Sequence, residues 1–230
     1  MSRMFASVFA IFWKDVLSEI RTKEIVTAVL VFALLVLVIF NFAFDPASGM
    51  TAASGTTARI APGILWVAFT FAGILGLNRV FAVEKENSSL AGLRLCPVDR
   101  MVIFWGKLAG SFTFMLVIAA VITPIFLVLF NLPLFLPRLA LIIVLATLGF
   151  TSVGTLFSAL AMNIRARDIM LPILFLPLVV PVIIGAVETT TCVLAGGPWS
   201  DMLTWLEIMI AFDIIYLVVA TLMFEFVIEE

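Results

Sequence analysis

The sequence predicts an all-α integral membrane protein: six transmembrane helices preceded by an amphipathic interfacial helix. Of its 230 residues, 64% are hydrophobic and only 12% are charged, a composition that excludes a separate water-soluble domain. Six stretches almost free of charge each approach the roughly 20 apolar residues that a helix needs to cross a bilayer core. They are 25–44, 60–78, 108–130, 139–162, 169–187 and 203–228. We therefore expect one membrane domain that spans residues 1–230.

The distribution of positive charge predicts the orientation. If alternate loops lie on opposite sides of the membrane, eleven of the 13 Lys and Arg residues fall on one side. Only Arg59 and Arg138 fall on the other side. Because cationic loops stay in the cytoplasm, we expect both termini to be cytoplasmic and the number of spans to be even.

Residues 1–21 form the predicted interfacial helix. Their apolar side chains recur every three or four residues, and their polar side chains lie on the opposite side. This pattern is typical of a helix that lies in the membrane interface. It could serve only as an anchor, or it could also contact a cytosolic partner.

Two predicted spans carry small residues at four-residue spacing, which lets helix backbones approach closely in lipid. The pattern leaves open whether these faces meet a neighbour in the same chain or a second copy of the chain. The residues are Ala68, Ala72, Gly76, Thr147, Thr151, Thr155 and Ala159.

The predicted span 169–187 carries Pro172, Pro177 and Pro181. Each proline removes a backbone donor and obstructs the carbonyl four residues earlier, so we expect this helix to be kinked or partly broken. A hinge beside a transport path is one interpretation. The other is the ordinary tolerance of proline in membrane helices.

The last predicted span carries three acidic residues, of which Glu225 lies at the cytoplasmic end, where water is within reach. Glu207 lies near its external boundary and Asp213 lies closer to mid-membrane. An ionised carboxylate at mid-membrane costs about 2.5 to 3.5 kcal/mol on insertion scales, so we expect Asp213 to face the bundle interior, a cavity or a subunit contact. A role in a substrate path and a packing or protonated role both fit.

Enzymatic chemistry has little support in this sequence. The chain contains no histidine, the usual ligand or base in metal, haem and serine-hydrolase sites. It also lacks a G-x-S-x-G elbow and a phosphate-binding P-loop. We therefore expect no metal site, no bound cofactor and no ATP hydrolysis by the chain itself. Cys96 and Cys192 are predicted on opposite sides of the membrane, Cys192 in the last external loop, so they cannot pair.

The longest cytoplasmic connection, 79–107, has an ordered pattern of its own. A predicted helical extension ends at 87–89, a short segment with leucines on one face follows, and Pro97 precedes a new helix start. A short helix of this kind fits the groove of a partner protein. A solvated charged loop is the alternative.

This connection resembles the coupling loop of ABC-2 type exporter permeases. The segment 58–68, with Arg59, Pro62 and Trp66, is similar to the signature of the haem exporter permease B family (CcmB) of cytochrome c maturation, and the stretches 14–24 and 224–230 also fit. The residues that carry the coupling-loop resemblance are Glu84, Glu86, Leu90, Gly92, Leu93, Leu95, Pro97 and Lys107.

The resemblance implies a permease subunit of the bacterial cell (inner) membrane that works with a separate cytosolic ATP-binding subunit. It also implies a haem-handling membrane protein, a periplasmic haem chaperone, haem as the possible cargo and two permease copies in the complex. Because the chain has no imidazole, haem ligation is expected to belong to a partner.

Two alternatives remain: a generic exporter permease for lipid or drug, and an assembly subunit that does not transport. Arg59 could meet a haem propionate or an acidic partner surface, since guanidinium binds carboxylates in a bidentate manner. It could equally be an interfacial anchor.

Overall fold

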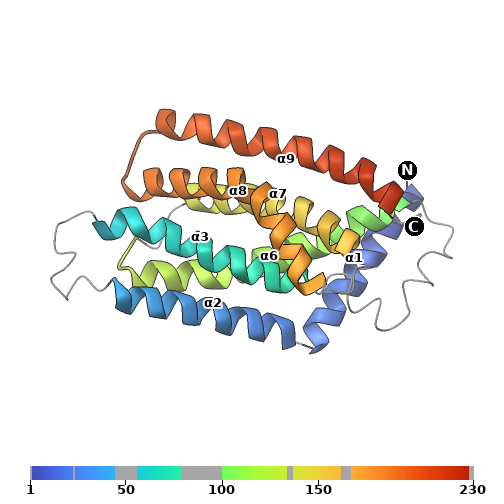
Figure 1. The fold of residues 1–230 in the computed structure, drawn as a ribbon, viewed down its shortest axis with the longest axis horizontal. Coiled ribbons are helices and arrows are strands. Elements are labelled where there is room, and N and C mark those ends of the chain that lie inside the picture. The colour runs from blue at the N-terminus through green and yellow to red at the C-terminus, as the bar shows by residue number, and fades with distance from the viewer. Residues whose placement is uncertain are drawn as a thin grey trace.

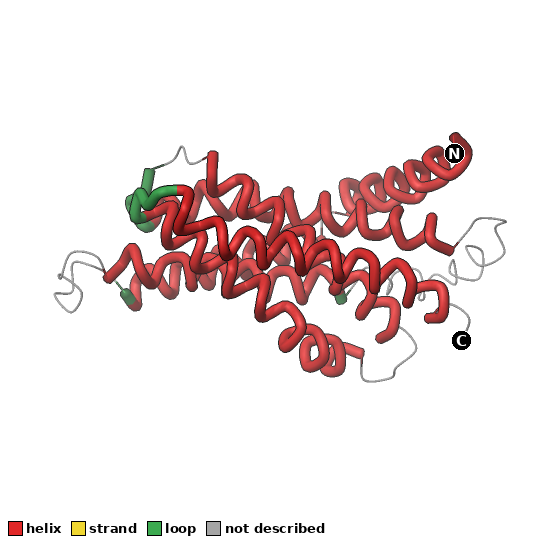
Figure 2. Tube along the Cα trace, turned by 90° about the horizontal axis from the view of Figure 1, so that it is seen from above, coloured by secondary structure: helices red, strands yellow, loops and turns green. Residues whose placement is uncertain are grey.

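The computed structural model describes residues 2–22, 24–44, 56–78, 100–133, 137–161 and 167–227. This part of the chain forms seven helices and no strand (Figure 2). The helices are α1 (Ser2–Thr22), α2 (Glu24–Ala43), α3 (Thr56–Leu77), α6 (Arg100–Leu129), α7 (Pro137–Ala161), α8 (Arg167–Leu194) and α9 (Trp199–Val227).

Six of these helices, α2, α3, α6, α7, α8 and α9, are long and apolar enough to cross a membrane. The predicted all-helical fold with six candidate spans is therefore confirmed. The side of the membrane on which the termini lie stays a prediction. Figure 1 places the start of α1 and the end of α9 at the same end of the bundle, as an even number of spans requires.

The spans are arranged around α7. This helix contacts α3, α6, α8 and α9, and every residue of 149–156 is buried. Helices α2 and α9 form opposite edges of the bundle (Figure 1). The hydroxyl side chains of α7, from Thr147 to Ser158, are thus buried among the other helices.

Small residues set the closest helix contacts. A side chain at Gly154 of α7 would collide with Leu77 of α3, and the Ser158 hydroxyl donates to the Leu77 carbonyl at 2.8 Å. Gly73 of α3 lies equally close to Phe150 of α7. The residues of the two predicted small-residue faces are themselves buried within the described chain, and Gly76 lies against Phe114 of α6, so these faces pack against neighbours in the same chain.

Aromatic rings fill the space between α3, α7 and α8. The ring centroids of Phe69 and Phe150 lie 5.4 Å apart, and those of Phe150 and Phe175 lie 4.7 Å apart, both in edge-to-face geometry. Such pairs add about 0.5 to 1.5 kcal/mol beyond their buried area. They hold α7 against both neighbours.

Helix α8 differs from its prediction in length. It passes through all three prolines as one helix that bends along its course (Figure 1) and ends at Leu194 instead of residue 187. The hydroxyls of Thr189 and Thr191 donate to the carbonyls of Gly185 and Val187, at 2.6 and 2.8 Å. Because these polar side chains are satisfied within the helix, they do not end it.

The prediction that Cys192 lies in an external loop was therefore wrong, because Cys192 belongs to the last turn of α8. That helix ends with Gly196 at φ 71°, and the Gly197 amide donates to the Cys192 carbonyl at 2.9 Å. This is a Schellman ending, which uses the left-handed conformation that glycine adopts at low cost. It makes the turn into α9 short.

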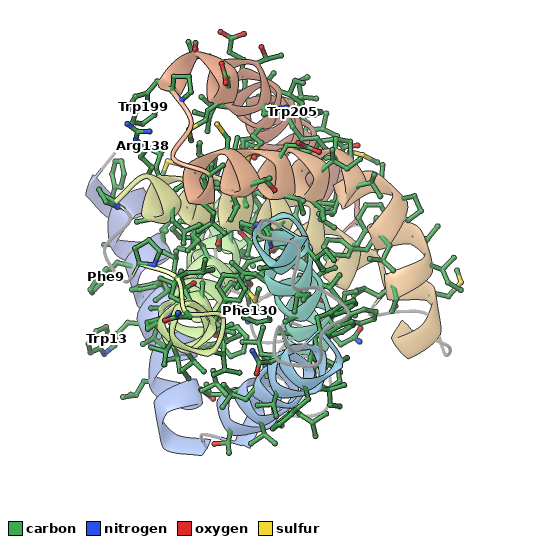
Figure 3. All side chains as sticks on the ribbon, turned by 90° about the vertical axis from the view of Figure 1, so that its left-hand side faces the viewer. Phe9, Trp13, Phe130, Arg138, Trp199 and Trp205 are labelled. Atoms are coloured by element: carbon green, nitrogen blue, oxygen red, sulfur yellow. The ribbon has the colours of Figure 1, made fainter. Side chains whose placement is uncertain are left out.

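Helix α1 matches the predicted interfacial helix and crosses one end of the bundle at a steep angle to the spans (Figure 1). Phe5, Phe9, Trp13 and Leu17, four residues apart, are exposed. Figure 3 shows Phe9 and Trp13 pointing away from the bundle. An exposed apolar stripe of this kind suits the membrane interface.

Candidate functional site

The junction between α1 and α6 lies where the cytoplasmic side is predicted. The Lys107 ammonium of α6 lies 2.9 Å from Asp15 Oδ2 of α1, and the two side chains are 4% and 22% exposed. Glycines precede and follow the lysine on α6. A Cβ on Gly106 would lie 2.8 Å from the Ile11 Cβ, and one on Gly110 would lie 3.4 Å from the Asp15 Cβ. Because Gly106 and Gly110 have no side chains, α1 packs directly against the backbone of α6, and the ammonium of Lys107 is buried at this contact.

This arrangement makes the ion pair a link between two helices. A buried lysine that loses its carboxylate is strongly disfavoured, so the pair resists separation of α1 from α6. Helix α6 begins at Arg100, directly after residues 79–99. Whatever moves the start of α6 also acts on α1 through Lys107.

Lys107 was predicted to belong to the coupling loop. The structure places it in the second turn of α6, and its ammonium is engaged within the chain. The other predicted coupling residues lie outside the described residues. They are Glu84, Glu86, Leu90, Gly92, Leu93, Leu95 and Pro97.

The external-side candidates are only partly described. Arg59 lies in the first turn of α3, and its side chain is outside the described part of the structure. Pro62 was predicted in the first helical turn, but α3 begins earlier, at Thr56. Pro62 is therefore inside the helix, where its ring opposes the carbonyl of residue 58.

Trp66 occupies the core of the bundle. Its side chain is buried, and the indole N–H donates to the Thr190 hydroxyl of α8 at 3.0 Å. Thr190 itself is fully buried. This hydrogen bond links α3 to α8. Because Trp66 is buried, neither face of its ring is exposed at the surface in this conformation.

Asp213 of α9 was expected to face the interior, and it does. It is 3% exposed, and neither carboxyl oxygen has a hydrogen-bond partner in the described structure. The carboxyl lies directly against Gly149 in the middle of α7, in contact that an added Cβ would prevent. The hydroxyls of Thr147 and Thr155 on α7 are also buried without a partner. The centre of the bundle therefore holds polar groups whose bonding is incomplete.

The other predicted intramembrane acid, Glu207, behaves differently. It belongs to the same helix, but its side chain is exposed on the outside of the bundle. Asp213 and Glu207 therefore lie in different surroundings and do not form one site.

Arg138, one of the two predicted external cations, is held inside the fold. Its guanidinium donates to the Gly197 carbonyl at 3.0 Å and lies 4.8 Å from the centre of the Trp199 ring. Figure 3 shows Arg138 and Trp199 side by side. The arginine fastens the start of α7 to the turn between α8 and α9.

Sequence reasoning missed the partners of these residues. Asp15 was assigned to the polar face of the interfacial helix and to the stretch 14–24, and Thr190 was placed beyond the end of the span 169–187. A signal for Asp15 did exist, because Lys107 stands between two glycines at the start of an apolar helix. A buried cation in such a place needs a carboxylate from a neighbouring element.

Comparison with known proteins assigns the chain to a family. A family model described as "CcmB protein" matches residues 6–229. The chain belongs to the CcmB family. This confirms the family that the segment 58–68 and the cytoplasmic connection suggested. The CcmB match covers all of α1 from residue 6 onward and all six candidate spans.

Three relatives of this CcmB chain carry the name "Heme exporter protein B". One, from Paracoccus denitrificans, is 31% identical over 173 residues, which cover 75% of this chain and 78% of the relative. Another, from Rhodobacter capsulatus, is 34% identical over 165 residues, with 69% and 71% covered. A third, from Pseudomonas aeruginosa, is 28% identical over 178 residues, with 77% of both chains covered.

Proposed function

We propose that this chain is the permease subunit of an ABC transporter complex that exports haem for the biogenesis of c-type cytochromes. The observation that carries the proposal is membership of the CcmB family over residues 6–229, with relatives named as haem exporters. Six apolar helices provide the membrane-spanning part that such a subunit needs. ATP is hydrolysed by a separate cytosolic ATP-binding subunit.

In this proposal the ATP-binding subunit acts on the segment from Glu84 to Pro97. Both termini and this segment face the cytosol of a bacterial cell, and the complex contains two permease copies. A push on the segment reaches α6 at Arg100, and the Lys107–Asp15 pair passes it to α1. The tight contacts of α7 then pass movement among the remaining spans.

Haem is the proposed cargo. The chain has no histidine, so the haem iron is held by a haem-handling membrane protein before it reaches a periplasmic chaperone. Arg138 is engaged with Gly197 and Trp199. Arg59 is therefore the external cation that we assign to a haem propionate or to an acidic surface of a partner.

The coupling assignment is tested by Leu93→Ala and Glu84→Ala in cells that make c-type cytochromes. We expect both variants to insert normally and to keep ATPase activity in the purified complex, while cytochrome formation falls. Val31→Ala, an exposed position on α2, is the control and should leave cytochrome levels unchanged. Normal cytochrome levels in both loop variants would refute the coupling role.

A second experiment separates export from assembly. Inverted membrane vesicles that contain the whole complex are supplied with ATP and haem, and haem inside the vesicles is measured. ATP-dependent accumulation supports export. ATP-dependent release of the chaperone without haem entry would assign the chain to an assembly role instead. A complex that purifies without any haem-binding membrane protein would favour a generic exporter for lipid or drug.

A further inference from the structure

One exposed face of α9 combines an acid with a helix-packing pattern. Glu207 lies between two exposed apolar residues, Leu203 and Ile210, on a stripe that continues through Ile214 and Val218 at spacings of three or four residues. Residues with this spacing lie on one side of a helix. The stripe runs along the edge of the bundle that α9 forms in Figure 1.

The candidate membrane span of α9 begins at Trp199 and not at residue 203, so Glu207 lies further inside the span than the sequence predicted. Glu207 follows Trp199, the first residue of α9, by eight positions, which places it about 12 Å further along the helix axis. The hydrocarbon core extends about 15 Å from its surface to its centre. An acidic side chain at such depth is disfavoured against lipid, and acids in spans usually face protein or water.

The described chain does not supply a partner for this carboxyl group. Glu207 has neither a hydrogen bond nor an ion pair within the described part of the chain. Arg138, at the same end of the bundle, is bound to Gly197 and Trp199. Within the described residues the carboxylate of Glu207 is therefore uncompensated, which favours a partner from another molecule.

The neighbours of Glu207 suit a close helix contact. Thr204, one turn before it, and Ala211, one turn after it, are both exposed and both small. Small side chains on each side of a polar one let a second helix approach and bond to it, the usual way in which helices associate in lipid.

This face is poorly suited to a contact with a second copy of this chain. A two-fold symmetric contact through the stripe would set the same residue of each copy near its counterpart, so the two Glu207 carboxylates would repel each other. Charge complementarity instead calls for a cation or a strong donor at the same depth.

We propose that the Leu203–Glu207–Ile210 face of α9 is the docking surface for a transmembrane helix of a different membrane protein. That helix presents a lysine, an arginine or another hydrogen-bond donor to Glu207. This surface does not include the predicted coupling segment. The docking proposal can therefore be tested independently of the proposal that the cargo is haem.

Site-specific photo-crosslinking in native membranes tests the proposal. A photoreactive phenylalanine analogue replaces Leu203 or Ile210. The matched control is Leu35, which is exposed on α2 at the opposite edge, eight residues from the end of that helix. We expect positions 203 and 210 to form adducts with a transmembrane segment of another protein that bears such a donor, and position 35 to form none with that segment.

The acid itself is tested in the same strains. Glu207→Leu should lower the adduct yield roughly tenfold, the change expected when a charge-assisted bond is lost, whereas Glu207→Asp should preserve it. Because Glu207 is exposed, Glu207→Leu should not weaken the isolated fold, which thermal unfolding in nanodiscs verifies. The proposal is overturned by adducts with a second copy, with lipid alone or with a segment that lacks a donor. An adduct yield unchanged by Glu207→Leu also overturns it.

Discussion

The ammonium of Lys107 lies 2.9 Å from the carboxylate of Asp15, and this ion pair joins the interfacial helix to the span that follows the predicted coupling segment. The lysine is almost completely buried, whereas the aspartate keeps partial access to the surface. The contact therefore depends on Asp15 to compensate a cation that has left water.

Removing that carboxylate is predicted to destabilise the protein. Asp15→Leu removes the carboxylate that lies 2.9 Å from the buried Lys107 ammonium and should lower the free energy of unfolding by on the order of 3 kcal/mol. Lys14→Ala is the matched control, because its pair with Asp15 is about half-exposed and should contribute less than about 1 kcal/mol. The measurement is thermal unfolding in nanodiscs. The double variant Asp15→Leu with Lys107→Met should recover most of the loss, and equal stability of Asp15→Leu and Lys14→Ala would disprove the link.

The contact of Gly149 with Asp213 predicts a steric effect. Gly149→Ala places a methyl group against the Asp213 carboxyl group and should cost about 1 to 3 kcal/mol of stability. Gly63→Ala is the control, because nothing lies within 4 Å of the added Cβ and the helix should gain up to about 1 kcal/mol. If both variants unfold at the same temperature, α7 and α9 do not approach each other as described.

Asp213 itself is predicted to lower the stability of the fold. Neither of its buried oxygens has a hydrogen-bond partner among the described residues, which costs about 1 to 3 kcal/mol, so Asp213→Leu should raise the unfolding temperature. Thr221→Val, whose lost hydroxyl bonds only within its own helix, should change it little. A large loss of stability in Asp213→Leu would mean that the carboxyl is satisfied in the working protein. Cytochrome formation in the same variant shows whether the acid is also required for function.

The bond between Trp66 and Thr190 predicts a measurable coupling between α3 and α8. A double-mutant cycle of Trp66→Phe and Thr190→Val should give a coupling energy of about 0.6 kcal/mol, the average for such bonds in membranes. Thr189→Val is the control for the threonine change, because that hydroxyl bonds to carbonyls of its own helix. A coupling energy of zero would show that the indole donor has another partner.

Several elements could be predicted from the sequence because they depend on patterns among residues that are close together in the chain. Hydrophobic length alone located all six spans, and the recurrence of apolar residues every three or four positions located α1. The end of α8 was missed for a local reason too. Threonine hydroxyls that bond to the preceding turn extend a helix past the point where hydropathy falls, as at Thr189 and Thr191.

The candidate site was less predictable, since partners from distant parts of the chain decide what each polar residue does. Asp213 and Glu207 are six residues apart on one helix, yet one is buried against Gly149 and the other faces outward. A hydropathy scale gives the two acids similar values. Their surroundings differ only because α7 packs beside α9.

The sequence by itself determined the membrane setting, the number of spans, the interfacial helix and the CcmB family, because these follow from composition, periodicity and local motifs. The tertiary structure decided that Lys107 binds Asp15, that Trp66 binds Thr190, and that Arg138 holds the turn before α9. These contacts join residues 59 to 124 positions apart in the chain. They depend on how the helices cross, and that is fixed by side-chain packing across the whole bundle.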